Sequence, residues 1–384
     1  MQMKAIAMFI FFTFITTVFF LSSWYVYSHG VTALKGSGIL TCFKWTYWII
    51  AATFIVGQAL ERGEPLLISK IVSHIGSIWL SVFLYLFLFV LVTDIVRLIH
   101  YIYPFFPDRI FPSLNNGLLL FYTAIIISFA ITIYGFINAR NAGVTRISIN
   151  SEKRITGYNK LKIVMVSDVH IGAMLGKPRV EEMIEKINGL KPDIVIFAGD
   201  LVDHNPRFLI AGKMGDAFLK LKAPLGIYAV AGNHEFIGNA EKSIEYLSQF
   251  GIIYLRDTLT DLGNGIQIAG RDDRDKIRFD GIARKKLSEV LKNFDSEKFT
   301  ILIDHQPVDY KLVKESGVDL MLSGHTHKGQ LWPFNFITDA IYPNHYGLFT
   351  DGSTNYYTSS GYGTWGPPVR TGNRPEIVEI TISF

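Results

Sequence analysis

Charged side chains are distributed very unevenly along this chain of 384 residues. Only twelve of the 70 Asp, Glu, Lys and Arg residues lie in residues 1–140, and the other 58 lie in residues 141–384. A water-soluble domain is about a quarter charged, which describes the second part of the chain and not the first. The sequence therefore predicts a transmembrane domain at residues 1–145, followed by a globular domain at residues 146–384.

Four apolar stretches of the N-terminal part are long enough, or nearly so, to cross a membrane. The hydrocarbon core of a bilayer is about 30 Å thick and requires about 20 helical residues. A cleaved signal peptide is the alternative for the first stretch, but its apolar run is too long and no small-residue cleavage site follows. We therefore expect transmembrane helices at about 5–27, 40–60, 75–99 and 117–138.

Four spans place both ends of the chain on the same side of the membrane. Lysine and arginine are enriched in the cytoplasmic flanks of membrane spans. With the N-terminus inside, the inner flanks contain seven such residues and the outer flanks contain four. This difference favours a multi-pass protein of the cell inner membrane or plasma membrane, with its C-terminal domain in the cytoplasm.

The composition of the C-terminal part excludes some classes of function. Residues 141–384 contain 29 basic and 29 acidic side chains, so they lack the net positive charge expected of a nucleic-acid-binding domain. The single cysteine, Cys42, excludes an intramolecular disulfide framework and a cysteine-rich zinc site. The lipid bilayer and a substrate of the globular domain are the expected partners.

Beyond about residue 145, short apolar segments alternate with segments of helical periodicity. Strands that are apolar on both faces are typical of sheets covered by helices. The predicted fold of this part is α/β, with two packed β-sheets flanked by helices in an α/β/β/α sandwich. The main strands are predicted at 161–168, 193–200, 226–233, 300–305 and 318–325, shorter strands at 252–255, 266–269, 347–350, 355–359 and 376–383, and helices at 178–190, 207–222, 239–250, 282–294 and 307–316.

Five of the predicted strands end in Asp, Asn or His. Ligands of open α/β sheets gather at the carboxyl ends of the strands. A single histidine of this kind is most simply a hydrogen-bonded residue, but five such ends have no packing explanation, because buried charges and imidazoles are costly unless paired or metal-bound. Mixed oxygen and nitrogen ligands suit divalent Mn, Fe or Zn. The residues at these ends are Asp168, His170, Asp200, Asp203, Asn233, His234, Glu235, His305, His325 and His327, and Gly199, Gly232 and Gly324 before them permit close approach of the backbone.

In order and spacing these blocks resemble the calcineurin-like metallophosphoesterase superfamily, whose motifs are D-x-H, G-D-x-x-D, G-N-H-[DE], H and G-H-x-H. The resemblance extends over roughly residues 160–330, and the segment Ser360–Pro368 is similar to the closing segment of a membrane-associated bacterial branch. The resemblance implies a metal-dependent phosphoesterase with two divalent metal ions, of which Mn is favoured over Fe or Zn.

The resemblance also implies a role for each residue of the site. In the superfamily a hydroxide that bridges the two metals attacks phosphorus. His234 is not one of the metal ligands. It would protonate the leaving group, and Asp203 would orient its ring. One metal would be bound by Asp168, His170, Asp200 and His327, and the other by Asp200, Asn233, His305 and His325, with Asp200 bridging.

Two departures from related motifs narrow the substrate class. The protein serine/threonine phosphatases of the superfamily continue G-D-x-x-D with Arg-Gly, whereas this chain continues with His204 and Asn205, which disfavours a protein phosphatase. Lys328 stands where the membrane-associated branch usually has glycine. Its side chain either contacts a phosphate or is simply solvated.

The segment 331–349 contains nine bulky apolar residues, too many for an exposed loop. It is either a hydrophobic flap that leans on the bilayer or part of the packing of the second sheet. Together with the membrane helices, the flap favours a lipid-linked substrate such as UDP-diacylglucosamine, which similar membrane-bound superfamily members hydrolyse.

Two alternative functions stay open from the sequence. The first is a phosphodiesterase that acts on soluble nucleotides or small diesters, with the membrane helices serving only for placement. The second is a non-catalytic metal-binding scaffold. The presence of His234 and Asp203 disfavours the scaffold, because metal binding alone requires neither residue.

Overall fold

The computed structural model describes residues 2–107 and 115–384, with side chains from residue 13 onward. The chain divides into two compact units. The helical unit comprises Met1–Leu60 and Ile71–Tyr134, and the globular unit comprises Glu61–Lys70 and Gly135–Phe384. The predicted domain boundary at residue 145 stays a prediction.

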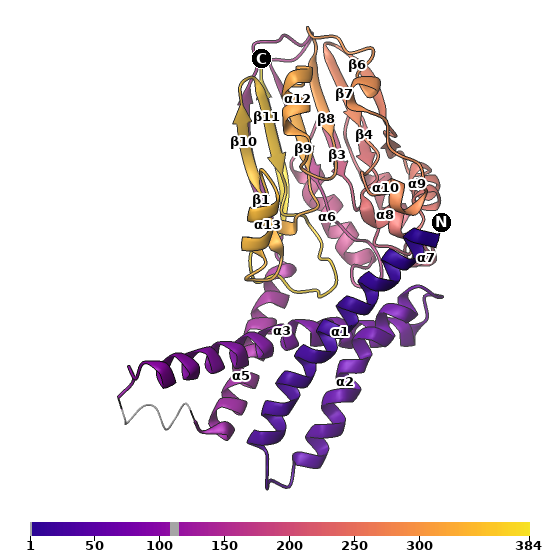
Figure 1. The fold of residues 1–384 in the computed structure, drawn as a ribbon. Coiled ribbons are helices and arrows are strands. Elements are labelled where there is room, and N and C mark those ends of the chain that lie inside the picture. Colours follow the sequence, from indigo (N-terminus) through magenta and orange to yellow (C-terminus); the bar gives the residue numbers. More distant parts are fainter. Residues whose placement is uncertain (1, 108–114) are drawn as a thin grey trace. The chain divides into compact units, whose positions relative to one another are not determined.

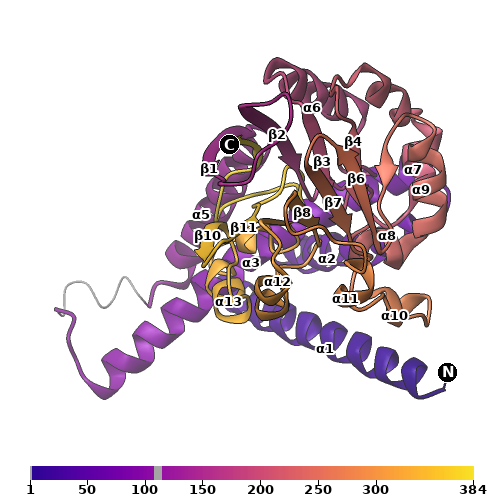
Figure 2. The same cartoon turned by 90° about the horizontal axis from the view of Figure 1, so that it is seen from above.

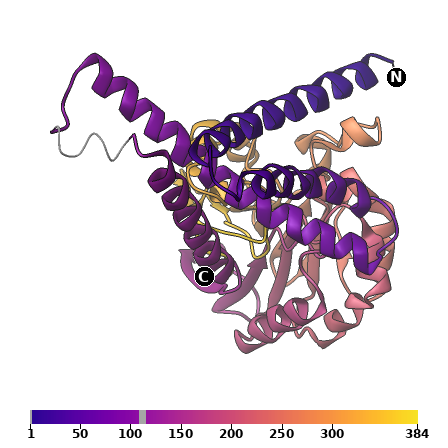
Figure 3. The same cartoon turned by 90° about the horizontal axis from the view of Figure 1, so that it is seen from below.

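Long helices form the N-terminal part of the chain (Figures 1 and 3): α1 (Gln2–Ala33), α2 (Leu40–Glu61), α3 (Leu67–Ile102) and α5 (Gly117–Ala139). Within the described residues, α2, α3 and α5 are long and apolar enough to cross a membrane. The first predicted span, 5–27, falls partly on residues 2–12, whose side chains lie outside the described part of the chain. That span stays a prediction.

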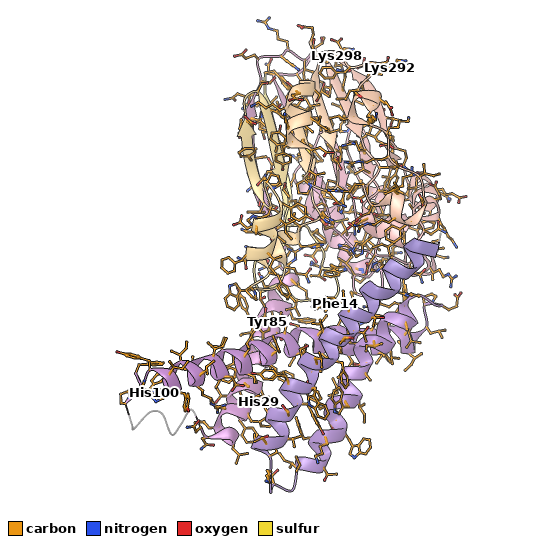
Figure 4. The ribbon with its side chains drawn as sticks, viewed as in Figure 1. Phe14, His29, Tyr85, His100, Lys292 and Lys298 are labelled. Carbon is orange, nitrogen blue, oxygen red and sulfur yellow. The ribbon has the colours of Figure 1, made fainter. Side chains whose placement is uncertain are left out.

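Apolar side chains project outward from these helices, as lipid-facing side chains do. Phe14 on α1 is 65% exposed and is labelled in Figure 4. The ionisable Asp94 on α3 is satisfied within the helical unit: its carboxylate lies 3.0 Å from Arg97 Nη1, 2.9 Å from His29 Nε2 and 2.6 Å from the Tyr25 hydroxyl. These three partners give Asp94 a structural role.

In the described residues the globular unit contains two six-stranded sheets. The strands are β1 (Gly143–Asn150), β2 (Lys160–Val166), β3 (Ile194–Ala198), β4 (Ile227–Val230), β5 (Ile253–Tyr254), β6 (Thr258–Gly263), β7 (Ile266–Gly270), β8 (Phe299–Ile303), β9 (Leu320–Ser323), β10 (Gly347–Asp351), β11 (Thr354–Thr358) and β12 (Glu376–Ser383). The first sheet has the order β1-β12-β2-β3-β4-β5, and the second has the order β10-β11-β9-β8-β7-β6. Both sheets are mixed, because β12 runs antiparallel to β2, and β10 antiparallel to β11.

Three apolar layers hold the sheets and helices together. Helices α6 (Lys177–Gly189) and α9 (Ala240–Ser248) pack on the outer face of the first sheet, and α11 (Leu287–Val290) and α12 (Tyr310–Ser316) pack on the outer face of the second. The layer between the sheets is built from the opposite faces of the same strands. Figure 2 shows α6 and α12 on opposite sides of the paired sheets. The predicted α/β class with two packed sheets is confirmed.

Two predicted helices differ from the structure. The segment 207–222 divides into α7 (Pro206–Ala211) and the 3-10 helix η1 (Met214–Lys220), because Lys213 between them adopts a left-handed φ of 46°. Within 282–294 only α11 is helical. The residues before it are held by tertiary contacts instead, since the Lys285 amide donates to Asp257 and Arg284 pairs with Asp304.

The sequence prediction also missed strands β1 and β6. Both lie at or near sheet edges, β1 beside β12 and β6 beside β7. Their side chains are mostly half-buried or exposed, so neither strand has the continuous apolar run of the central strands.

Candidate metal centre

Five strands bring the predicted site residues to one place in the globular unit. The chain leaves β2, β3, β4, β8 and β9 directly into the segments that carry them. Parallel strands end at the same edge of a sheet, and the ends of the two sheets meet here. The structure brings together all nine predicted residues: Asp168, His170, Asp200, Asp203, Asn233, His234, His305, His325 and His327.

Asp168, His170 and His327 form the first group of potential metal ligands. Each offers one ligand atom, and these atoms all lie within 4.8 Å of one another. His170 Nε2 lies 3.0 Å from His327 Nε2, which in turn lies 3.4 Å from Asp168 Oδ1. All three residues are buried.

Asp200, His305 and His325 form the second group, again with ligand atoms within 4.8 Å of one another. His305 Nε2 lies 3.1 Å from Asp200 Oδ2 and 3.2 Å from Asn233 Oδ1. His325 Nδ1 lies 2.8 Å from the same Asn233 oxygen. Asp200 Oδ2 is also 3.9 Å from His170 Nε2, so this carboxylate lies between the two groups.

The donor chemistry of the second group fits a cation. His305 Nδ1 lies 2.9 Å from the Ala198 carbonyl, which can only accept, so Nδ1 carries a hydrogen. In the neutral imidazole, Nε2 then carries no hydrogen, although it faces two oxygen atoms. Such an arrangement is stable only if a positive charge lies between these atoms. Burial lowers the pKa of His305, but the carboxylate of Asp200 outweighs burial and raises that pKa well above its usual value. The pocket therefore stabilises positive charge, supplied by a proton or by a metal.

The backbone around these ligands leaves no room for a side chain at two of its glycines. A Cβ atom at Gly199 would lie 2.3 Å from His305 Nδ1, and one at Gly324 would lie 2.3 Å from Asp168 Oδ2. Gly199 also has a φ of +87°, a conformation that side chains disfavour. Non-glycine residues with positive φ collect at functional sites, and here they include Asp168, His170, Asp200, His325 and His327.

His234 lies beside the two groups with its Nδ1 atom 2.8 Å from Asp203 Oδ1. Burial lowers the pKa of His234, but the carboxylates of Asp200 and Asp203 outweigh this and raise it to about 9. Divalent cations nearby would oppose that rise. His204 stacks on His234 with ring centroids 4.2 Å apart, and burial lowers its own pKa to about 4. In the metal-free site these shifts favour a proton on His234 over one on His204.

Glu235 is a site residue to which the sequence analysis assigned no role. Its buried carboxylate accepts hydrogen bonds from the backbone amides of Asp200 (3.1 Å), Val202 (2.7 Å) and Gly232 (2.8 Å). These contacts tie the end of β3 to the end of β4. The available signal was its place as the fourth residue of the Gly-Asn-His-Glu block.

Asp304 and Lys328, which neighbour predicted ligands in the sequence, lie outside the ligand groups of the described residues. Asp304 is fully buried and pairs with Arg271 (3.0 Å) and Arg284 (2.9 Å). Lys328 Nζ lies 3.8 Å from the centroid of the Tyr346 ring, a cation–π contact that neither alternative for this side chain included.

Several known proteins are similar to this chain in sequence. Residues 161–329 match the family model of the calcineurin-like phosphoesterases. The chain is 36% identical to an uncharacterized metallophosphoesterase of Aquifex aeolicus, over 62% of this chain and 91% of that protein. It is 30% identical to one of Campylobacter jejuni, over 97% of this chain and 98% of that protein.

The name of a third relative combines membrane-spanning segments with a metallophosphoesterase domain. The transmembrane protein with metallophosphoesterase domain of Danio rerio is 30% identical, over 67% of this chain and 62% of its own length. Buried Asp and His groups consistent with a dinuclear metal site accompany these similarities. The chain therefore belongs to the calcineurin-like metallophosphoesterases, a family of metal-dependent phosphoesterases.

Proposed function

We propose that the protein is a membrane-anchored phosphoesterase with two metal ions that hydrolyses a phosphodiester or pyrophosphate bond in a lipid-linked substrate such as UDP-diacylglucosamine. The observation that carries this proposal is a group of exposed apolar side chains in the segment 331–349, which we call the apolar flap. This segment leads directly from the last two predicted metal ligands.

Exposure of the apolar flap favours contact with lipid over packing of the second sheet. Helix α13 (Asn335–Ile341) buries none of its residues, and Phe336 and Ile341 are 65% and 64% exposed. A contiguous apolar surface of this kind is unusual on a soluble protein without a partner. The exposed large side chains of the flap are Trp332, Phe334, Phe336, Ile337, Ile341, Leu348 and Phe349.

The flap is joined to the proposed site by an aromatic contact. Tyr342 follows α13 directly, and its ring centroid lies 5.8 Å from that of His325. A substrate whose acyl chains lie along the flap would therefore reach the ligand groups with its phosphate. This continuity supports an amphipathic substrate with its phosphoester close to the apolar portion.

The proposed ligands of one metal are Asp168, His170, Asp200 and His327, and those of the other are Asp200, Asn233, His305 and His325. The oxygen and nitrogen donors suit Mn²⁺, which we propose as the native ion. When bound, two such ions supply Lewis acidity that acidifies water and neutralises charge on the phosphate.

Two residues of the chain, Asp203 and His234, then supply the proton that the leaving group receives. Asp203 fixes the ring of His234 through Nδ1, which leaves Nε2 to face the substrate. The imidazolium donates its Nε2 proton to the departing oxygen. The negative charge of Asp203 favours the protonated ring and holds it in one orientation.

We further propose that residues 1–145 anchor the protein in the membrane and that residues 146–384 act in the cytoplasm. The helices α2, α3 and α5 support the anchor, and the excess of basic residues in the flanks supports the orientation. In this orientation the apolar flap would lie on the cytoplasmic side of the membrane.

The proposal is tested with the full chain in detergent, loaded with Mn²⁺. UDP-diacylglucosamine in mixed micelles and the soluble bis-p-nitrophenyl phosphate serve as substrates for the wild type and for the double variant Phe336→Ser/Ile341→Ser. Leu312→Ser is the control, because Leu312 is an exposed apolar residue of α12 outside the flap. We expect the flap variant to lose at least about tenfold in lipid turnover and to retain activity on the soluble diester. Equal retention of both activities would favour a soluble nucleotide or diester as the substrate.

A further inference from the structure

An exposed tryptophan lies beside the proposed proton donor. The Trp365 side chain is 56% exposed, although the residues around it in the closing segment are largely buried. Its ring centroid lies 6.4 Å from that of His234, with the two planes at 87°. An edge-to-face contact of this kind leaves much of the indole surface free.

The loop that carries Trp365 is held by the side chain of Gln330. The Trp365 amide donates to Gln330 Oε1 at 2.9 Å, and Gln330 Nε2 donates to the carbonyls of Trp365 (2.9 Å) and Pro367 (3.0 Å). Gln330 itself is buried and lies three residues after His327. Both the oxygen and the nitrogen of the buried Gln330 side-chain amide therefore hold this loop in position.

The same loop is anchored to the first ligand group on its other side. The Gly363 amide donates to the Asp168 carbonyl at 2.8 Å, and a Cβ atom at Gly363 would lie 2.0 Å from the Val169 carbonyl oxygen. The loop is therefore fixed at both ends of the segment that presents the indole. A rigidly presented aromatic surface binds a ligand with little loss of conformational entropy.

The position of Trp365 beside His234 indicates which part of the substrate it would contact. His234 Nδ1 is occupied by Asp203, and His204 stacks on the ring, so Nε2 is the ring nitrogen that can meet a leaving oxygen of the substrate. In an ester substrate the carbon framework attached to that oxygen must lie next to the imidazole. Trp365 is the exposed aromatic side chain in ring contact with His234 among the described residues.

We infer that Trp365 is a substrate-binding residue that forms a platform for the leaving group, and that Gln330 positions it. The enzyme then prefers phosphoesters whose leaving group presents a planar or apolar surface next to the ester oxygen. Compact alkyl leaving groups gain nothing from the indole. The inference rests on the role of His234 in the proposed function, but it does not depend on a lipid substrate.

A pair of non-hydrolysable phosphonates tests the platform without turnover. In benzylphosphonate and ethylphosphonate a methylene group replaces the leaving oxygen, and the two differ only in the group beyond it. Binding to the Mn²⁺-loaded full chain in detergent is measured by calorimetry. We expect the wild type to bind benzylphosphonate about tenfold more tightly, the factor that one aromatic contact typically contributes.

The variants separate a platform from a merely structural loop. Trp365→Ala abolishes the preference and leaves ethylphosphonate affinity within about twofold, whereas Trp365→Phe keeps most of the preference. Phe279→Ala, at an exposed phenylalanine of α10 (Lys276–Phe279) outside the apolar flap, leaves both affinities unchanged.

Three outcomes overturn the inference: no preference in the wild type, an unchanged preference in Trp365→Ala, or an equal loss of both ligands in that variant. Failure of the proposed lipid substrate has a different signature. In that case UDP-diacylglucosamine is not hydrolysed, while the benzylphosphonate preference persists and still depends on Trp365.

Discussion

Arg370 Nη2 lies 3.3 Å from Nδ1 of His327 and donates a hydrogen bond to it. A guanidinium offers only donors, so the imidazole nitrogen must accept. Arg370 is completely buried, and it also donates to the carbonyls of Ser360 (2.7 Å) and Gly363 (3.0 Å) and to the side-chain oxygen of Asn373. Residues 360–374, which we call the closing segment of the chain, therefore fix the orientation in which Nε2 of His327 points toward Asp168 and His170.

We expect Arg370→Met to weaken metal binding at the first ligand group. Residues that orient metal ligands typically contribute about 10–100-fold to metal affinity. The measurement is the Mn-to-protein ratio after dialysis against a weak chelator, which should fall from two toward one. Arg374→Met is the matched control, because Arg374 is an arginine of the same segment whose guanidinium bonds Asn141 at the surface. Full occupancy in Arg370→Met would show that His327 needs no such support.

Gly324→Ala should impair the same group by a steric route. The added Cβ would lie 2.3 Å from Asp168 Oδ2 and 2.6 Å from the Ser167 side chain, distances that force the carboxylate to move. We expect lower Mn occupancy and at least about tenfold lower diester hydrolysis. Gly189→Ala is the control, because a Cβ there meets no atom within 4 Å. Wild-type Mn occupancy in Gly324→Ala would contradict this expectation, because it would show that the backbone can move away from the added Cβ without disturbing the ligands.

Glu235→Gln should destabilise the globular unit even without metal. Oε2 accepts from the amides of Asp200 and Gly232, and Oε1 accepts from the amide of Val202. A glutamine side chain has only one oxygen, so at least one buried amide loses its acceptor, at a cost of about 1–3 kcal/mol. The thermal midpoint of the metal-free protein in detergent should fall by several degrees. Glu241→Gln, at an exposed partner of Arg256, should leave it unchanged.

His234→Ala should lower kcat by about 10²–10⁴-fold for substrates with alkyl leaving groups, and less for bis-p-nitrophenyl phosphate. The reason is that p-nitrophenolate leaves readily without a proton, whereas an alkoxide does not. Mn occupancy should stay at the wild-type value, and Asp203→Asn should give a smaller loss in the same direction. An equal loss for both kinds of leaving group would exclude His234 as the proton donor.

Removal of metal with a chelator should abolish hydrolysis of every substrate, and added Mn²⁺ should restore it. In Asp200→Ala neither metal position is complete, so activity should not return at any tested Mn²⁺ concentration. Metal content measured alongside activity distinguishes a lost ion from a misplaced one. Chelator-resistant activity would contradict a role for metal in the reaction.

Much of the site could be predicted from the sequence because its chemistry is local. Asp168 and His170 follow shortly after an apolar segment, and so do Asp200, Asn233 and His305. Apolar strands of one sheet place such ends at a common edge, so residues distant in sequence could be expected to meet. The uneven distribution of charge likewise predicts apolar helices before a globular part, since membrane insertion depends mainly on composition.

Other features depended on contacts between segments that have no local signature. Arg370, Trp365 and Gln330 acquire their significance only because the closing segment folds back onto the ends of β2 and β9. The helix predicted at 282–294 is confined to Leu287–Val290, and the buried Asp304 pairs with Arg284 from the part before it.

The exposure of the apolar flap was similarly undecided, since an apolar sequence is compatible with burial as well as with a surface. Composition and spacing determined which residues could form the site and where the chain is apolar. The tertiary structure decided which residues orient the ligands and which apolar groups stay exposed, because both depend on neighbours that are distant in the chain.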